Sequence, residues 1–258
     1  MFELSNVTVK VGHNNLLSSL DLRFEQGSIS AIMGANGAGK STLFKSLLGE
    51  YPVARGDIYF KGKPIADFTI AELSMQRAYI AQVKPSMFNM LVLEYLLLAR
   101  MQYIESAKRA ENLVLTIAAQ FSITHFLMRN LTTLSGGELQ LVEYVRAYLQ
   151  VYESDNMEGK CLLLDEPASA LDIKQTRLLY KHLKAFQKQM GTVIIIDHDI
   201  NQVGALASDI AFLKHGELLC YGKSREVFSK PNLDKCFDTQ GKIISSENHS
   251  NDFYHLAV

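Results

Sequence analysis

The sequence predicts an α/β fold that is interrupted by a helical insert, and three observations carry this prediction. Short apolar runs bounded by turns, such as 28–33 and 193–196, are typical of buried parallel strands. Residues 3–11 and 19–24 have the pattern of strands joined by a turn at 12–15. Residues 85–153 instead show long helical stretches without a convincing strand. Strand–helix alternation is therefore expected before and after the insert.

The remaining elements follow from local signals. A helix is expected from Lys40 to about Gly49, because a glycine-rich loop precedes it and a glycine ends it. Within the insert, loops are expected at 122–124 and 130–133, and a helix from Glu138 to about Val151. Apolar runs predict four further strands, at 56–60, 78–81, 161–164 and 210–212.

Composition excludes several classes of protein. The 258 residues are 48% hydrophobic and 21% charged, as in ordinary globular proteins, and the net charge of −1 predicts no broad nucleic-acid surface. The most apolar stretch, 90–101, contains charges and is far shorter than the ~20 residues of a membrane span. No signal peptide is recognisable, and the three cysteines lack metal-like spacing. We expect a cytosolic protein that reaches a membrane only through a protein partner.

A glycine-rich loop predicts binding of a nucleotide triphosphate. The segment matches G-x-x-x-x-G-K-[ST] between a predicted strand and a predicted helix, which is the context this motif requires. Glycines let backbone N–H groups turn towards phosphate oxygens, and the helix N-terminus adds positive potential. Lys40 is expected to neutralise the β and γ phosphates, and Ser41 to hold Mg²⁺. The predicted phosphate-binding residues are Gly34, Ala35, Asn36, Gly37, Ala38, Gly39, Lys40, Ser41 and Thr42.

Two adjacent acids predict the hydrolytic chemistry. Asp165 and Glu166 follow an apolar strand, and the carboxyl ends of buried parallel strands form the ligand-binding edge of such sheets. Asp165 is expected to hold the metal, and Glu166 to act as general base towards the attacking water. Taken alone, the pair equally suits a strand that ends in a polar turn. Gln82 and His198 also follow predicted strands, although either residue alone is weak evidence of a site.

A second candidate anion site opens the helix that begins near Glu138. Ser135, Gly136 and Gly137 stand at its N-terminus, where exposed N–H groups bind anions. One chain does not need two anion-binding helix N-termini to bind one triphosphate. If a second copy supplies one of them, each nucleotide is sandwiched between two chains of an isologous dimer.

With these motifs together, the sequence resembles the ATP-binding-cassette (ABC) family over nearly its whole length. GANGAGKST resembles Walker A, CLLLDE Walker B and LSGGE the signature motif, while Gln82, SALD at 169–172 and His198 match the Q-, D- and H-loops. The resemblance implies a P-loop NTPase with a RecA-like core (1–84 and 156–240), an N-terminal antiparallel β part, a helical subdomain (85–155) and a tail (241–258). It implies that two chains close head to tail on two ATP molecules with Mg²⁺. Glu166 and His198 would be catalytic, and Asp172 and Gln82 would contact the nucleotide site. The Mg²⁺ ion would be bound by Ser41, Gln82 and Asp165.

A narrower similarity concerns transport. Segments 77–82, 152–160, 213–228 and 231–233 resemble ATPase subunits of cobalamin, haem and ferric-siderophore importers, and most of all those of cobalamin importers. This implies integral permease partners, an indirectly linked substrate-binding protein, and a peripheral position on the cytoplasmic face of the inner membrane. Haem or siderophore import remains an alternative, as do a soluble non-transport ABC ATPase and an exporter's cassette. The cargo is not readable here, because other subunits of such importers select it.

Departures from the family pattern leave further questions open. Val11 stands where an adenine-stacking aromatic residue is usual, which leaves base selectivity open, and Leu141 and Ala168 replace a common arginine and threonine. Segment 84–90, with Met87, Phe88 and Met90, is either a permease docking site or part of the insert core. The tail 241–258 is either a regulatory appendage or a disordered terminus.

Overall fold

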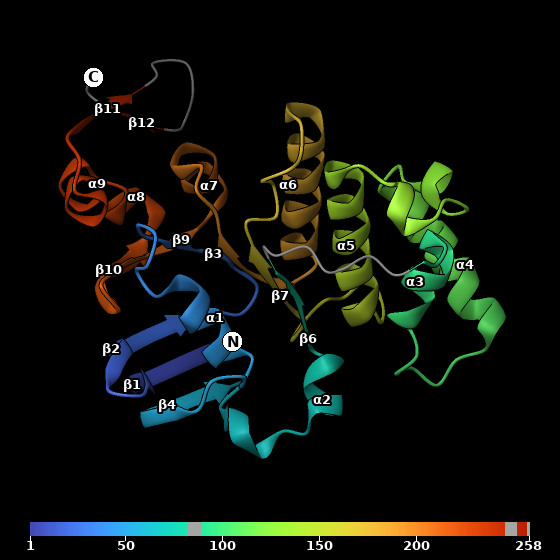
Figure 1. Ribbon diagram of the computed structural model, residues 1–258, viewed down its shortest axis with the longest axis horizontal. Coiled ribbons are helices and arrows are strands. Elements are labelled where there is room, and N and C mark those ends of the chain that lie inside the picture. Colours follow the sequence, from blue (N-terminus) through green and yellow to red (C-terminus); the bar gives the residue numbers. More distant parts are fainter. Residues whose placement is uncertain (82–88, 246–251, 257–258) are drawn as a thin grey trace. The chain divides into compact units, whose positions relative to one another are not determined.

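The computed structural model describes residues 1–81, 89–245 and 252–256 of the chain, which folds into two compact units (Figure 1). The first unit contains Met1–Phe68 and Thr192–Val258, and the second contains Thr69–Gly191. The predicted boundaries of core, helical subdomain and tail remain a prediction. Within the described residues, no helix combines the length and apolar character needed to cross a bilayer.

The first unit contains two sheets and the helices that accompany them. Its elements are β1 (Phe2–Val11), β2 (Asn14–Phe24), β3 (Ile29–Met33), α1 (Lys40–Leu47), β4 (Val53–Phe60), β5 (Lys63–Pro64), η1 (Ile65–Asp67), β8 (Thr192–Ile196), α7 (Ile200–Leu206), β9 (Asp209–Lys214), β10 (Glu217–Lys223), α8 (Ser224–Val227), α9 (Lys230–Phe237), β11 (Gly241–Ser245) and β12 (Asp252–Leu256).

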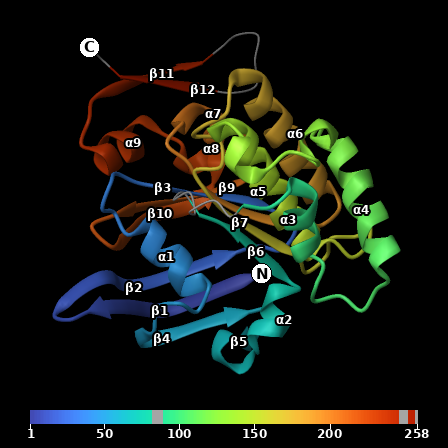
Figure 2. The same cartoon turned by 45° about the vertical axis from the view of Figure 1, so that its right-hand side comes forward.

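The antiparallel sheet has the order β2-β1-β4-β5, and its central strands lie side by side in both views (Figure 2). Phe2 pairs with Phe24 on one side and Phe60 on the other, and the Phe2 and Phe60 rings contact each other at a tilt of 44°, with centroids 4.7 Å apart. The prediction that β2 begins at residue 19 is wrong. The strand begins at Asn14, because backbone pairing with β1 continues to Asn15 and Asn14, whose side chains are exposed, while Leu17 between them and residue 19 is buried.

The second sheet of this unit is mainly parallel, with β10-β9-β3-β8 as neighbours. Strand β3 pairs in parallel with β8 and β9, and β10 is antiparallel to β9. All five residues of β3 and of β8 are buried. This burial on both faces explains why these strands were recognisable as continuous apolar runs.

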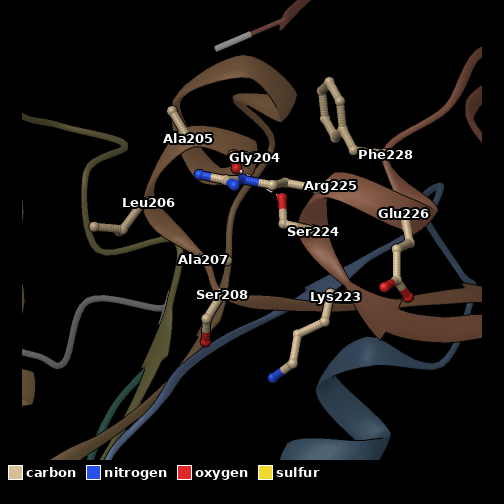
Figure 3. A pocket seen from close by; sticks show the side chains of 10 residues that line it. All are labelled: Gly204, Ala205, Leu206, Ala207, Ser208, Lys223, Ser224, Arg225, Glu226 and Phe228. Carbon is tan, nitrogen blue, oxygen red and sulfur yellow. Dashed lines mark hydrogen bonds between the residues drawn. The ribbon is translucent and has the colours of Figure 1, made fainter. Parts of the chain in front are cut away.

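The C-terminal part of the first unit contains a hairpin and a surface hollow. Strands β11 and β12 pair antiparallel from Gly241↔Leu256 to Ser245↔Asp252, and they lie against α9 and α7. The alternative of a disordered terminus is therefore wrong for 241–245 and 252–256. Between α7 and α8 lies a hollow of about 760 Å³, where the Ser224 hydroxyl donates to the Gly204 carbonyl at 2.9 Å (Figure 3). The residues that line this hollow include none of the predicted site residues.

The second unit is mainly helical. Its elements are α2 (Ile70–Ser74), β6 (Arg77–Ile80), α3 (Val92–Leu98), α4 (Ala107–Gln120), η2 (Thr124–Phe126), η3 (Leu131–Thr133), α5 (Gly136–Val151), β7 (Cys161–Asp165) and α6 (Ile173–Lys188). Strands β6 and β7 pair in parallel. Helix α5 packs against α3, α4 and β6, and it buries nine of its sixteen residues. The predicted helix from Glu138 to about Val151 is thus confirmed, two residues longer at its start.

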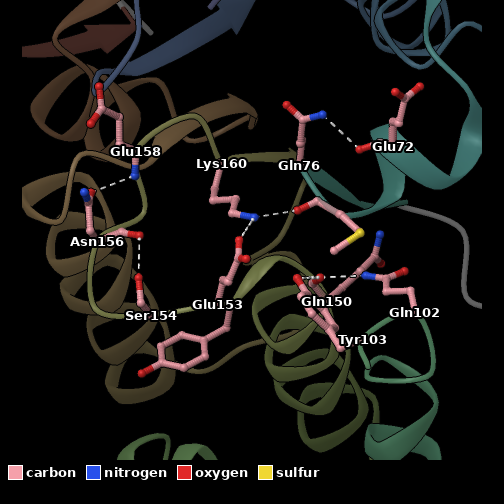
Figure 4. A network of polar contacts seen from close by, with 12 residues as sticks. Glu72, Gln76, Gln102, Tyr103, Gln150, Glu153, Ser154, Asn156, Glu158 and Lys160 are labelled. Atoms are coloured by element: carbon pink, nitrogen blue, oxygen red, sulfur yellow. Dashed lines mark hydrogen bonds and ion pairs between the residues drawn. The ribbon is translucent and has the colours of Figure 1, made fainter. Parts of the chain in front are cut away.

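Long polar side chains tie the ends of these elements together (Figure 4). Gln150, near the end of α5, donates to the carbonyls of Ser74 at 3.0 Å and Arg77 at 3.2 Å. Lys160 donates to the Met75 carbonyl at 2.9 Å and pairs with Glu153 at 2.8 Å. Carbonyls at the end of a short helix lack partners within the helix, and these side chains satisfy them. The network fixes the start of β6 relative to the end of α5 and to Lys160, the residue before β7.

Candidate functional site

The phosphate loop belongs to the first unit and connects β3 to α1. Gly37 and Gly39 have φ angles of +79° and +101°, which side-chain-bearing residues rarely adopt. Gly34 is required for space, because a Cβ there would lie 2.4 Å from the Leu213 carbonyl oxygen. Helix α1 has no side-chain N-cap and no acidic residue in its first turn. Its N-terminus therefore keeps the positive potential that favours a bound phosphate.

Lys40 is folded over this loop. Only 8% of the residue is exposed, and its Nζ donates to the carbonyls of Gly34 at 2.8 Å and Ala35 at 3.0 Å. The ammonium group is thus already positioned above the curl of the backbone where phosphates would lie. Ser41, the next residue, is exposed in the first turn of α1. The loop therefore presents a cation and a hydroxyl as the motif predicts.

A turn that sequence reasoning missed supports the loop. His215 and Gly216 connect β9 to β10, and the Gly216 N–H donates to the Ala38 carbonyl at 3.0 Å. The Gly216 carbonyl accepts from the Ser18 N–H at 2.8 Å, which links the turn to β2. A Cβ at Gly216 would lie 2.6 Å from the Leu16 carbonyl oxygen. A glycine between two strands was visible in the sequence, but its contact with the loop was not.

His198 lies at the same sheet edge as the phosphate loop. It follows β8, which pairs with β3 from Ile29↔Val193 to Ile32↔Ile196. Since both strands run in the same direction, the segments that follow them emerge at one edge. His198 is exposed, and Asp199 beside it caps α7 by accepting from the Gln202 N–H at 3.0 Å. The first unit thus gathers the phosphate loop and one of the two predicted catalytic residues.

The acid pair lies in the second unit at the end of β7. Asp165 is 4% exposed and Glu166 is 8% exposed. Glu166 has a φ of +51°, an unusual backbone conformation for a residue with a side chain. Its carbonyl accepts from the Ser169 N–H at 3.2 Å and from Gln140 Nε2 at 2.9 Å. Gln140 is a further site residue that the sequence analysis missed.

The signature segment forms the start of α5. Ser135 caps the helix by accepting from the Glu138 N–H at 3.3 Å, and Glu138 accepts from the Ser135 N–H at 2.7 Å. This backbone hydrogen bond, assisted by Arg129, lowers the pKa of Glu138 below its ordinary value. Ser135 is thus the N-cap of α5, which begins at Gly136, two residues before the predicted start at Glu138, and the serine hydroxyl accepts a hydrogen bond from its own helix.

The segment that matches the D-loop, 169–172, packs directly against the signature segment. A Cβ at Gly137 would lie 2.8 Å from the Ala170 carbonyl oxygen, so only glycine fits there without displacement. Asp172 caps α6, because its carboxylate accepts from the Gln175 N–H at 2.7 Å. The second unit thus brings together Glu166, the signature glycines and the segment that leads to Asp172.

Two predicted site features are not settled by these contacts. Gln82 and the proposed docking residues Met87 and Phe88 lie outside the described residues. Within residues 1–81, 89–245 and 252–256, no group of three or more His, Cys, Asp or Glu side chains gathers as in a metal-binding cage. That is compatible with Mg²⁺, which is bound through few protein oxygens together with phosphate and water. The Ser41 hydroxyl and Asp165 carboxylate are donors of this kind.

Comparisons with known proteins identify the family. A family model described as ABC transporter matches residues 17–169. The vitamin B12 import ATP-binding protein BtuD of Vibrio atlanticus is 34% identical over 91% of this chain and 93% of that protein. The chain belongs to the ABC transporter family. The hemin import ATP-binding protein HmuV of Methylobacillus flagellatus is 32% identical over 92% of this chain and 89% of its own length.

Solved structures agree with this membership of the ABC family. A metal-chelate type ABC transporter in an inward-facing conformation aligns with a TM-score of 0.81 at 25% identity, covering 99% of this chain and 96% of that chain. An ATP-binding cassette solved as a dimer after hydrolysis, with ADP and phosphate, aligns with a TM-score of 0.75 at 26% identity, covering 87% and 99%. The predicted fold class is confirmed, and this ABC protein is an ATP-binding ATPase.

Proposed function

We propose that this ABC ATPase energises a membrane importer whose cargo is cobalamin. The observation that carries the proposal is the 34% identity to a vitamin B12 import ATP-binding protein across 91% of the chain. The phosphate loop, the acid pair and the capped signature helix supply the parts that such a subunit needs. The narrower sequence similarity to cobalamin importers supports the same cargo.

ATP binding begins at the phosphate loop. The N–H groups of Gly34–Thr42 and of the α1 N-terminus donate to phosphate oxygens, and Lys40 exchanges its loop carbonyl contacts for the β and γ phosphates. Ser41 and Asp165 would hold Mg²⁺, with Gln82 as a third contact. When bound, the ion neutralises charge on the phosphates. Val11, which is 54% exposed, provides no aromatic surface, so other purine triphosphates are expected to be accepted.

Hydrolysis needs a base that is fixed relative to the attacking water. Glu166 takes a proton from that water, and Gln140 holds the backbone on which the carboxylate is carried. His198 contacts the γ-phosphate and orients it. Glu166 and His198 follow strands β7 and β8, and every residue of these strands is buried, so the backbone segments that carry the two side chains begin at fixed strand ends.

The working unit is a head-to-tail dimer of this chain. Ser135, Gly136 and Gly137 open α5, and their N–H groups offer a second anion-binding N-terminus for the nucleotide held by the partner. Asp172 follows Ala170, whose carbonyl packs against Gly137, and would contribute to the same interface. The dimer docks on integral permease subunits at the cytoplasmic face of the inner membrane, and a substrate-binding protein delivers cargo to the permease. No nucleic acid is involved.

Uptake in a strain that lacks this chain tests the proposal. The deletion strain is complemented with wild type, Glu166→Gln or empty vector, and labelled cobalamin is counted in the cells. Wild type alone is expected to restore uptake. If the deletion leaves cobalamin uptake unchanged, cobalamin is the wrong cargo. ATP hydrolysis by the purified chain is measured in parallel, so that the ATPase assignment is tested separately from the cargo.

Haem is the second candidate cargo. The 32% identity to a hemin import ATP-binding protein over 92% of the chain favours it specifically. The same strains are therefore tested with haem as the sole iron source. Growth that depends on this chain, with cobalamin uptake intact, would assign haem instead.

A further inference from the structure

Helix α6 carries a row of positive charges along one face. Its sixteen residues include five cations and no carboxylate. The spacing between successive cations is three, four, three and four residues. This basic stripe consists of Lys174, Arg177, Lys181, Lys184 and Lys188.

The stripe is straight and faces away from the protein core. At about 100° per residue, the five cations fall within about 80° of one another around the helix. The buried residues Leu179, Leu183 and Phe186 occupy the opposite side, where the Phe186 ring contacts Tyr148 of α5 with centroids 5.8 Å apart. With a rise of about 1.5 Å per residue, the stripe is about 21 Å long.

Among the described residues, no ion pair offsets these charges. All five side chains are exposed, and none forms an ion pair within the described part of the chain. Other lysines do find partners there: Lys160 pairs with Glu153, and Lys223 pairs with Asp209. Like charges three or four residues apart destabilise a helix, and a cation in its first turn opposes the helix dipole. Lys188 lies in the last turn, where a cation is favourable, but the repulsion along the rest of the stripe weakens α6.

We propose that the basic stripe is a docking seam for an acidic α-helix of a protein partner. A repeat of three and four residues keeps side chains on one line facing a neighbouring helix, as in paired helices. Carboxylates at the same spacing on the partner would each face one cation. Four of the five cations are lysines, whose compact charge and flexible stem suit a row of single contacts. The proposal does not depend on the importer assignment.

The surroundings of the stripe favour a narrow occupant over a membrane or a nucleic acid. The Met157 N–H donates to the Gln189 carbonyl at 2.7 Å, which places the loop carrying Glu153 and Glu158 beside the end of α6 (Figure 4). The phosphates of a membrane or of a nucleic acid cover a wide area and would be repelled by Glu153 and Glu158. A single helix that lies along the stripe is narrow enough to avoid both acids. Tyr180 lies beside the stripe on α6 but is only partly exposed, so it offers a limited stacking surface for bases.

The two ends of the stripe add apolar contacts. Ile173, just before the first cation, is 84% exposed, and Met190, just after the last, is 50% exposed. Protein interfaces combine such apolar anchors, methionine in particular, with charged contacts. A partner helix with acids along its middle and apolar residues at both ends would match the whole face.

A synthetic peptide tests this seam. The probe is a fluorescein-labelled helical peptide of eighteen residues with glutamates at i, i+3, i+7, i+10 and i+14 and a leucine at each end; the control peptide has the same composition with the glutamates scrambled. Fluorescence anisotropy with the full chain is expected to give tighter binding of the spaced peptide, by about fivefold or more. Equal binding of both peptides would overturn the seam.

Charge reversal supplies the matched variants. Lys181→Glu with Lys184→Glu is expected to weaken binding of the spaced peptide by roughly tenfold or more, because two contacts become repulsive. A peptide with lysines at the facing positions should regain it. Lys10→Glu with Lys108→Glu changes net charge equally at exposed sites elsewhere, and should leave binding nearly unchanged. Equal weakening in both double variants would show a diffuse charge effect and refute the proposal.

Two further measurements close the test. ATP hydrolysis by Lys181→Glu/Lys184→Glu should equal that of wild type, because both residues are exposed and lie outside the catalytic machinery. Its melting temperature should be no lower than that of wild type, because the reversal relieves repulsion along α6. Vesicles of phosphatidylcholine and phosphatidylserine, and single-stranded RNA, are tested as competing ligands at the same salt concentration. Stripe-dependent binding to either one that exceeds binding of the spaced peptide would overturn the assignment of an acidic helix.

Discussion

The side-chain amide of Gln140 holds the backbone at Glu166. Its Nε2 donates to the Glu166 carbonyl at 2.9 Å, while its Oε1 accepts from the Ala170 N–H at 3.0 Å. Gln140 stands on α5, five residues after the cap residue Ser135. Any displacement at the start of this helix is therefore transmitted to the backbone that carries the proposed base. Since Glu166 has a φ of +51°, it depends on such external support.

Replacing Gln140 should impair hydrolysis more than nucleotide binding. We expect Gln140→Ala to lower kcat by about 10- to 100-fold, because the carboxylate of Glu166 loses its fixed position. The affinity for ATP, measured by equilibrium binding, should change little. Gln150→Ala is the matched control: it removes the same amide from the same helix, but its contacts are with Ser74 and Arg77. Normal kcat in Gln140→Ala would contradict the positioning role.

Removing the charge of Glu166 should separate binding from turnover. Glu166→Gln keeps the shape of the side chain but not a group able to accept the proton of water. We expect ATP binding to persist while kcat falls by roughly 10²- to 10⁴-fold. The measurement is phosphate release in single and multiple turnovers. A variant that hydrolyses ATP at a nearly normal rate would remove Glu166 from the role of base.

Replacing Lys40 should weaken the binding of ATP. Lys40→Ala removes a cation from the phosphate loop together with its hydrogen bonds to Gly34 and Ala35. We expect the Kd for ATP to rise by roughly tenfold or more, because charge-assisted contacts to phosphate are lost. Lys45→Ala on the same helix is the control, since that side chain instead lies over the Tyr51 ring. Unchanged affinity in Lys40→Ala would count against the phosphate-loop assignment.

Burial decided how much of the fold could be predicted from the sequence. Strands β3, β7 and β8 are buried along their whole length, so their apolar runs marked them within one residue of their bounds. The first two residues of β2, Asn14 and Asn15, are polar and exposed, and it is their backbone pairing with β1 that extends the strand to them. The hairpin of β11 and β12 likewise depends on pairing between segments, which no local pattern reveals.

The candidate site divides in the same way. The phosphate loop, the acid pair and the signature segment are local motifs, and their positions on loops and helix starts were predictable from spacing and glycine content. The supports of these motifs come from elsewhere in the chain. Gln140 donates to Glu166, which is 26 residues away in the sequence. Gly216, in the turn between β9 and β10, donates to Ala38 of the phosphate loop. Such contacts arise only when the tertiary structure forms, so sequence spacing gave no signal for them.

The ion pair of Arg100 and Glu105 should make stability depend on pH in the acid range. The two side chains are only 5% and 6% exposed, and the carboxylate accepts from Arg100 Nε at 2.8 Å and Nη2 at 3.1 Å. These hydrogen bonds, together with the charge of Arg100, lower the pKa of Glu105 from its ordinary value of 4.5. The pair therefore stabilises the fold fully above pH 4.5, where Glu105 is ionised in both folded and unfolded chains.

Below that pH the unfolded chain takes up the proton first, so the stabilisation declines until the folded Glu105 is protonated as well. Glu105→Gln should lower the free energy of unfolding by about 1–3 kcal/mol at pH 7, because the buried Arg100 loses its charged partner. Urea titrations at pH 7, 5, 4 and 3.5 should show the difference from wild type shrinking below about 4.5, the ordinary pKa of a Glu carboxyl. The exposed Glu111→Gln on α4 should have no such effect. A difference that stays constant down to pH 3.5 would mean that the loss comes from packing and not from the charge of Glu105.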